Sequence, residues 1–302
     1  MSTRPLFVGP LLHLRTLPAL EGLAPAYLTA LAQETEEVLL TRGMPLMTRG
    51  SLAQELHVIV DGTVTLQRGG NVSTAGPGDV VGFLELLSQE ASETDAVVDV
   101  DTVALKLDAD GLREACERHF AILMSLVSSI SRQIVQDPVA LRALVQGNGP
   151  EGGVPVRGEL DRVGRMVALH RSPAFPSASM DALAELAGNL REVRFGVGDP
   201  LWRVGDPADG FYLLCDGLVR YTSPAAGWSV DVGPGGVPGL PATLANTRWT
   251  VAASAVTDVV ALRVDTEPFL DVLEDHFHMA FQFLGRLARC LLGAQEQTDR
   301  NG

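Results

Sequence analysis

Cysteine is scarce in this sequence, and long apolar runs are absent. The three cysteines, Cys116, Cys215 and Cys290, are far apart and lie among apolar residues, so we expect them to fill the core rather than form disulfides or bind a metal. No segment reaches the roughly 18 uninterrupted apolar residues of a membrane helix, and the N-terminus leads into no clear signal peptide. We therefore expect a cytoplasmic protein with no membrane partner.

Basic residues are also in deficit. The 23 lysines and arginines stand against 37 aspartates and glutamates, which gives a formal net charge of −14. Proteins that bind DNA or RNA must neutralise phosphates with positive charge. We therefore expect no nucleic-acid partner.

The motifs of common enzymes are missing as well. The sequence has no Gly-x-Ser-x-Gly elbow and no Gly-x-x-x-x-Gly-Lys phosphate loop, the parts that nucleophilic hydrolysis and nucleotide hydrolysis need. The one His-x-His pair, His276 and His278, lies in a predicted helix, where a spacing of two points the rings to different faces. We expect no catalytic residue, no metal site, no cofactor and no enzyme activity.

The chain contains one folding unit twice. The segment from Leu14 aligns without a gap on the segment from Leu169, at a constant offset of 155 residues. Matched positions include Pro18 with Pro173, Gly43 with Gly198, Gly50 with Gly205, and Asp61-Gly62 with Asp216-Gly217. Each copy is close to the roughly 150 residues of a typical domain. We therefore expect a first domain at 1–146, a flexible Gly- and Pro-rich linker at 147–158 and a second domain at 159–302.

Each copy begins with a short helical pattern, continues with short strands and ends with a longer helix. The apolar runs around Asp61-Gly62 and Asp216-Gly217 predict hairpins with tight turns. At 112–134 and 270–291 the apolar residues step by threes and fours, which predicts a closing helix. Many short strands with glycine-rich turns favour a jelly roll over a parallel sheet. We expect a mainly β fold with flanking helices: two tandem jelly-roll β-barrels, each closed by a long C-terminal helix.

These features occur in a familiar order. A short helix is followed by a Gly-x-Pro-Leu turn, an apolar strand into Asp-Gly, the segment Gly76-Pro77-Gly78-Asp79-Val80-Val81-Gly82, a Thr that opens the last strand, and a long helix. The pattern, over residues 14–135 and 169–293, resembles the cyclic nucleotide-binding domain, found in the regulatory subunit of the cAMP-dependent kinase and in catabolite activator proteins. The resemblance implies a sensor fold and a phosphate-binding cassette in each copy.

In that family the cassette resembles Gly-Glu-Leu-Ala, a short helix, then Arg followed by Ser, Thr or Ala and an Ala. The Glu accepts the ribose hydroxyl, and the Arg pairs with the cyclic phosphate. The corresponding residues of the first copy, at 82–96 (the first cassette), are Gly82, Phe83, Glu85, Thr94, Asp95 and Ala96. Phe83 replaces the Glu and Thr94 replaces the Arg. Because Thr94 cannot neutralise a phosphate and Asp95 opposes one, we expect this cassette to be degenerate.

The second copy departs from the pattern in another way. Its candidate residues, at 239–250 (the second cassette), are Gly239, Leu240, Arg248, Trp249 and Thr250. Trp249 stands at the Arg position, but a shift of one residue would bring the Arg248 guanidinium into the pocket, with Trp249 stacked on a flat ligand. Alternatively, Arg248 faces solvent and Trp249 fills the cavity. If either cassette binds an anion, we expect it to be this one.

Two functions are compatible with these cassettes. In the first, the protein is a non-enzymatic regulatory adaptor that has lost standard cAMP and cGMP binding and acts through protein–protein contacts. In the second, it is a true sensor that binds a cyclic nucleotide or another small anion in the second domain and signals to a partner. The missing Glu and Arg in both copies favour the adaptor. The chain also ends too soon after the second closing helix for a helix-turn-helix, so we expect an unidentified protein partner.

The closing helices also predict self-association. They carry many large apolar residues, among them Met124, Val127 and Ile130 in the first and Phe277, Phe281 and Phe283 in the second. The near-heptad spacing of the first suits packing of helix on helix. We expect a homodimer held mainly by one of these helices, unless both fold back within the chain.

Overall fold

The computed structural model describes four stretches of the chain, residues 8–147, 154–156, 160–176 and 178–301. The chain forms two compact units. The first unit is Met1–Ile130 together with Leu284–Gly302, and the second is Ser131–Phe283. Among the described residues, no helix is long and apolar enough to cross a membrane.

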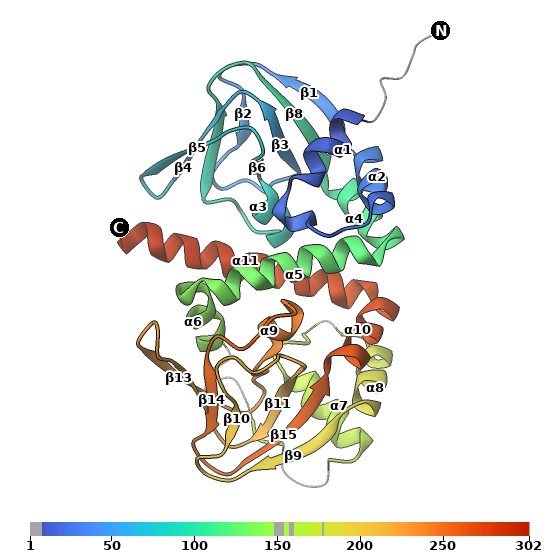
Figure 1. Ribbon diagram of the computed structural model, residues 1–302, viewed down its shortest axis with the longest axis vertical. Helices are drawn as coiled ribbons and strands as arrows, with labels where there is room; N and C mark the ends of the chain where they lie inside the picture. The colour runs from blue at the N-terminus through green and yellow to red at the C-terminus, as the bar shows by residue number, and fades with distance from the viewer. Residues whose placement is uncertain (1–7, 148–153, 157–159, 177, 302) are drawn as a thin grey trace. The chain divides into compact units, whose positions relative to one another are not determined.

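The first unit contains two four-stranded antiparallel sheets (Figure 1). One has the order β1-β8-β3-β6 and the other β2-β7-β4-β5. The strands are β1 (Glu36–Leu40), β2 (Pro45–Met47), β3 (Glu55–Asp61), β4 (Val64–Arg68), β5 (Asn71–Ala75), β6 (Val80–Val81), β7 (Thr94–Val98) and β8 (Thr102–Asp108). Buried and more exposed residues alternate along β7, and Ile59, Val64 and Ala96 form part of one buried apolar cluster. Strands of both sheets contribute to this cluster, so the two sheets enclose a common core.

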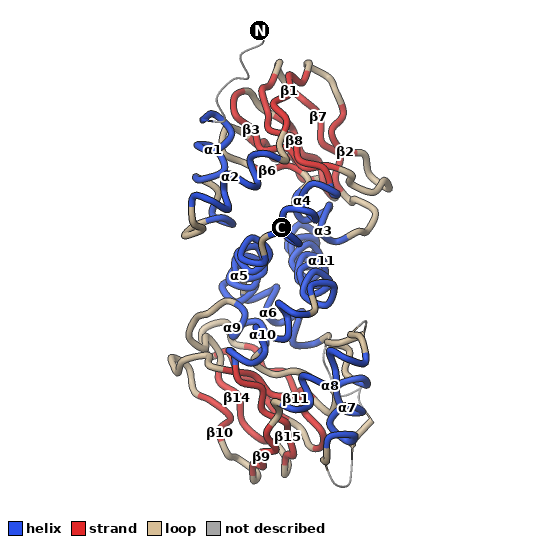
Figure 2. Tube along the Cα trace, turned by 90° about the vertical axis from the view of Figure 1, so that its right-hand side faces the viewer, coloured by secondary structure: helices blue, strands red, loops and turns tan. Residues whose placement is uncertain are grey.

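Helices flank these sheets. They are α1 (Val8–Arg15), the 3₁₀ turn η1 (Pro18–Leu20), α2 (Pro25–Gln33), α3 (Phe83–Ser88), α4 (Ala109–Arg118) and the first part of α5 (Phe120–Gln136). Figure 2 shows α1 and α2 together beside the strands of this unit. The part of α11 (Phe277–Asn301) from Leu284 onward also belongs to the first unit.

The second unit repeats the plan with a three-stranded sheet, β11-β15-β9, and a four-stranded sheet, β10-β14-β12-β13. Its strands are β9 (Arg191–Phe195), β10 (Pro200–Trp202), β11 (Gly210–Asp216), β12 (Val219–Ser223), β13 (Trp228–Val232), β14 (Ala252–Ala255) and β15 (Val259–Asp265). Its helices are α6 (Pro138–Gln146), α7 (Arg162–Arg171), α8 (Met180–Gly188), α9 (Leu240–Leu244) and α10 (Thr266–Asp275), with the start of α11.

The predicted fold class is confirmed. Both units are mainly β with flanking helices, although their sheets do not close into continuous barrels. The two Asp-Gly turns lie where the repeat places them. Gly62 and Gly217 have φ of 101° and 88°, a region that other residues rarely adopt, and a Cβ on Gly62 would collide with Thr102.

The compact units group the chain differently from the division at 146 and 159 that the repeat implies. Residues 131–146 belong to the second unit and 284–302 to the first. The physical reason is that α5 and α11 each continue through a boundary between units. An apolar stripe shows that a helix buries one face, but it does not show which sheet covers that face.

The expected linker, 147–158, lies mostly outside the described residues. Of the part that is described, Gly147 is the C-cap of α6. The Val156 N–H donates to the Cys215 carbonyl at 2.9 Å. Its expected flexibility therefore stays a prediction.

Candidate functional site

The first cassette begins at Gly82 and runs through α3 into β7. Gly82 has φ of 85° and precedes the first helical residue, the half-buried Phe83. Thr94, at the position of the family's Arg, opens β7 and is only 3% exposed. Because β7 pairs with β4, Thr94 lies directly opposite Arg68.

Arg68 places a guanidinium in the first cassette. Its Nε donates to Thr94 Oγ1 at 2.9 Å, and its Nη1 donates to Gln295 Oε1 at 2.9 Å. Its Nη2 lies 3.5 Å from Glu85 Oε1 in a largely buried ion pair. A strand neighbour therefore supplies the positive charge that Thr94 lacks, but groups of the chain itself occupy its donors.

A polar cavity of about 120 Å³ lies beside Arg68. Its charged lining residues are Arg68, Glu85, Glu90, Glu93, Arg289 and Glu296. Four carboxylates against two guanidinium groups leave a net negative charge, which opposes a bound phosphate. The α11 segment forms one wall, so the cavity is covered by the first unit's own C-terminal helix.

The remaining predicted residues of the first cassette lie outside this cavity. The Asp95 side chain accepts a hydrogen bond from the Arg49 N–H at 2.8 Å. Ala96 is fully buried in the apolar core. Of the six candidates, only Glu85 and Thr94 line the cavity.

The second cassette is closed by aromatic packing. Trp249 is 5% exposed, and its ring lies 4.2 Å from the Trp202 ring at an interplanar angle of 19°. A Cβ on Gly239 would come within 2.7 Å of the Trp249 ring. Trp249 therefore occupies space next to the Gly239 turn and leaves no room there for a further group.

Tyr221 fixes the turn from the other side. Its hydroxyl accepts a hydrogen bond from the Gly239 N–H at 2.9 Å. Burial raises the pKa of Tyr221 well above its ordinary value, so the hydroxyl stays neutral over the physiological range. The backbone donor at the start of α9 is thus already satisfied inside the protein.

Arg248 is directed away from this turn. It is exposed, and its Nη1 donates to the Gly205 carbonyl at 2.7 Å. It is not among the residues that line the nearby cavity. These positions correspond to the alternative in which Trp249 fills the pocket and Arg248 faces solvent.

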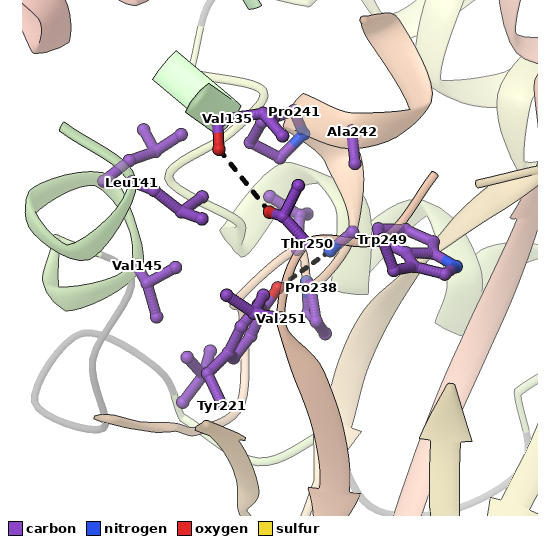
Figure 3. A pocket seen from close by; sticks show the side chains of 14 residues that line it. Val135, Leu141, Val145, Tyr221, Pro238, Pro241, Ala242, Trp249, Thr250 and Val251 are labelled. Atoms are coloured by element: carbon purple, nitrogen blue, oxygen red, sulfur yellow. Dashed lines mark hydrogen bonds between the residues drawn. The ribbon is translucent and has the colours of Figure 1, made fainter. Parts of the chain in front are cut away.

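The second cavity is small and apolar. Its volume is about 30 Å³, against roughly 300–1,000 Å³ for a typical ligand pocket. Figure 3 shows Leu141 and Val145 of α6 on one side and the Trp249 ring on the other side of Thr250. The Thr250 hydroxyl lies 3.5 Å from the Val135 carbonyl. Among the described residues, no charged side chain lines this cavity, whereas Arg68 and Arg289 line the cavity of the first cassette.

Sequence comparison identifies the family of both units. The profile of the Cyclic nucleotide-binding domain matches residues 37–119 and 192–276, which together make up more than half of the chain. The chain belongs to the cyclic nucleotide-binding domain family. The predicted resemblance is therefore confirmed for both copies.

Structural comparison finds solved structures of low sequence identity and low TM-score. The regulatory subunit of a cAMP-independent protein kinase A from Trypanosoma brucei is 20% identical, with 92% of this chain and 91% of that chain covered and a TM-score of 0.35. The corresponding subunit from Trypanosoma cruzi, bound to guanosine, is 17% identical over 100% and 93%, with a TM-score of 0.36. The N-terminal domain of a transcriptional regulator from Streptomyces coelicolor is 27% identical over 42% and 93%, with a TM-score of 0.37. No curated protein matches the chain.

As a member of this family, the chain has an Arg in the first cassette that local sequence does not reveal. Arg68 lies 26 residues before Thr94 and reaches it only through the pairing of β4 with β7. The sequence feature that points to Arg68 is the hairpin after Asp61-Gly62, because it determines the position of β4, which ends at Arg68. In the described part of the chain, no group of three or more His, Cys, Asp or Glu side chains is placed to hold a metal ion.

Proposed function

We propose that this member of the cyclic nucleotide-binding domain family is a non-enzymatic regulatory adaptor that has lost standard cAMP and cGMP binding and acts through protein–protein contacts. One observation carries the proposal. In each cassette the position of the phosphate-binding Arg belongs to a side chain packed inside the protein: Thr94 bonded to Arg68, and Trp249 stacked on Trp202.

The energetics of the first cassette support this proposal. A cyclic phosphate would have to displace Gln295 and Glu85 from Arg68 and approach Glu90, Glu93 and Glu296 as well. A charge-assisted bond contributes about 1.5–3 kcal/mol. Here an incoming phosphate would break such bonds before it formed new ones, and it would meet an excess of negative charge.

The second cassette supports the same conclusion by volume and polarity. Its cavity of about 30 Å³ is too small for a nucleotide, and the described residues that line it include no cation for a phosphate. The alternative function, a sensor for a cyclic nucleotide or another small anion in the second domain, requires the Arg248 guanidinium in the pocket. Arg248 instead donates to the Gly205 carbonyl, and no observation favours this alternative.

The partner is proposed to be a protein. We also propose a homodimer through the closing helices, although only part of the expected apolar side chains is exposed enough to contact a second copy. Val127, Ile130 and Phe283 are at most 5% exposed in the single chain. The remaining large apolar candidates, Met124, Phe277 and Phe281, are half-buried.

Isothermal titration calorimetry with cAMP and cGMP tests the loss of binding. We expect no affinity tighter than about 100 μM for either nucleotide, because the Arg68 guanidinium is bonded to groups of the chain and Arg248 lies outside the second cavity. Arg248→Ala serves as the matched variant. A micromolar isotherm for the wild type would refute the proposal, and its loss in Arg248→Ala would establish the sensor instead.

A further inference from the structure

The C-terminal part of α11, residues 284–301, contacts the cassette helix α3 and Arg68 of β4 at successive turns. Gly285 lies closest, since a Cβ there would come within 2.9 Å of the Leu87 carbonyl oxygen. One turn later, Arg289 Nη1 donates to the Ser88 carbonyl at 2.9 Å. Further along, Gln295 accepts from Arg68 at 2.9 Å. All of these residues belong to the first unit.

These contacts follow the helical repeat. Gly285, Arg289, Leu292 and Glu296 are three or four residues apart and thus share one face of α11, and the last three line the polar cavity. This face therefore touches α3 and covers the cavity, and the neighbouring Gln295 reaches Arg68. Contacts at several successive turns fix the position of this part of α11 along its axis relative to α3 and Arg68.

Arg289 also completes the end of α3. The last carbonyls of a helix have no partner within it, and Arg side chains commonly satisfy them. Here α3 ends at Ser88, with Gln89 in the left-handed region at φ of 56°. The donor to the Ser88 carbonyl comes from α11. The accompanying ion pair, Arg289 Nε to Glu90 Oε1 at 3.7 Å, is exposed and contributes little.

We propose that the C-terminal part of α11, residues 284–301, is an internal ligand of the first cassette, and that Gln295 and Arg289 hold this cassette closed without any small molecule. Gln295 occupies the guanidinium of Arg68, and Arg289 ties α11 to the end of the cassette helix. The proposal rests on the proposed function, because it explains what fills a cassette that binds no cyclic nucleotide. The first domain is thus kept in its covered state, and it opens only when these contacts break.

Two glycines on α11 give a sharp test by hydrogen–deuterium exchange. Alanine raises intrinsic helix propensity over glycine at any interior position. Gly293→Ala adds a Cβ with nothing within 4 Å, so residues 286–297 should exchange more slowly or at an unchanged rate. Gly285→Ala forces α11 away from the Leu87 carbonyl, so the same residues should exchange about tenfold faster despite the gain in propensity. If both variants slowed exchange alike, the docking would be refuted.

The polar contacts are tested in the same way. Gln295→Ala and Arg289→Ala should each raise the exchange rates of residues 286–297 several-fold and leave residues 277–283 unchanged. The matched control is Gln297→Ala, which changes an exposed Gln on the same turn. Equal exchange in Gln295→Ala, Arg289→Ala and Gln297→Ala would overturn the proposal. The exchange experiment is done without nucleotide, so its result does not depend on whether calorimetry detects binding of cAMP or cGMP.

Discussion

Arg68 and Thr94 face each other across β4 and β7, and the Arg68 guanidinium is bonded to the residue that stands where the family's phosphate-binding Arg is expected. The cassette thus keeps a guanidinium, supplied from the neighbouring strand. That guanidinium is directed at Thr94, Gln295 and Glu85. The chain has replaced the contacts of a ligand with contacts of its own.

Removal of this guanidinium should destabilise the first unit. We expect Arg68→Ala to lower the free energy of unfolding by about 2–3 kcal/mol, because bonds to a charged group are lost and Glu85, only 8% exposed, is left without its cation. Urea denaturation measures this change. Arg49→Ala, which breaks an exposed ion pair to Asp95 at 3.9 Å, is the control and should change stability by less than about 0.5 kcal/mol. Similar values for the two variants would show that Arg68 has no structural role.

Neighbouring substitutions in the second cassette should have very different effects. Trp249→Ala removes a buried ring stacked on Trp202 and should cost about 3–5 kcal/mol. Arg248→Ala removes one exposed hydrogen bond to Gly205 and should cost about 1 kcal/mol or less. Thermal unfolding of both variants checks the ranking. A Trp249→Ala protein as stable as Arg248→Ala would mean that the ring does not fill the pocket.

Much of the fold follows from sequence, because its signals are local. The constant offset between Asp61-Gly62 and Asp216-Gly217 predicts both hairpins, since only Gly fits these turns at φ near 90–100°. The position of Thr94 in the cassette follows in the same way from its distance to Thr102.

The occupants of the cassettes do not follow from sequence. Arg68 reaches Thr94 through strand pairing, and Gln295 reaches Arg68 across 227 residues of chain. Periodicity predicts that α11 buries one face. It does not predict which unit covers that face, and the part of α11 from Leu284 onward belongs to the first unit. The sequence alone also does not show whether Arg248 or Trp249 faces the second pocket, because this depends on the tertiary contacts of Arg248 with Gly205 and of Trp249 with Trp202.

The exchange of segments between units predicts how a cut chain behaves. A single cut within 147–158 leaves residues 131–146 on the N-terminal fragment and 284–302 on the C-terminal fragment, although each packs on the other fragment's unit. We expect the two fragments to elute together in native size-exclusion chromatography and to separate only in denaturant. Two independently folded fragments would instead support the division at 146 and 159.

His57 should make the first unit less stable in mild acid. The residue is 2% exposed, and burial is the main reason why its pKa lies below the ordinary value, with Glu55 opposing the shift and Lys106 adding to it. Below pH of about 6.5 the unfolded chain therefore binds a proton that the folded chain does not, and stability falls as pH falls. Asp231 and Asp265 also have lowered pKa values, but their contribution is lost only below pH of about 4.

Urea denaturation between pH 7.5 and 5.5 isolates this effect. The decline in stability should be smaller in His57→Gln than in the wild type. His170→Gln, which changes an exposed residue, should retain the full decline. A His57→Gln protein with the pH dependence of the wild type would show that the buried imidazole does not couple folding to pH.

If the chain is a homodimer held by a closing helix, charged substitutions at Phe281 and at Val127 should have different effects. Phe281→Glu, at a half-buried position of α11, should convert a dimer to a monomer with unchanged circular dichroism. Val127→Glu, at a position 1% exposed, should instead unfold the first unit, because it buries an unpaired charge. Light scattering at tens of micromolar gives the mass, and a monomeric wild type would remove the proposal.

A ¹H–¹⁵N NMR spectrum of the wild type, recorded with and without millimolar cAMP or cGMP, measures directly whether a cyclic nucleotide enters either cassette. The chain has three tryptophans, and the indole N–H of Trp249 reports on the second cassette, whereas the Arg68 Nε–H, bonded to Thr94, reports on the first. If the chain's own side chains fill both cassettes, neither resonance shifts with either nucleotide. A saturable shift of the Arg68 or the Trp249 resonance would show that a cyclic nucleotide enters that cassette, and cyclic-nucleotide binding would then not have been lost.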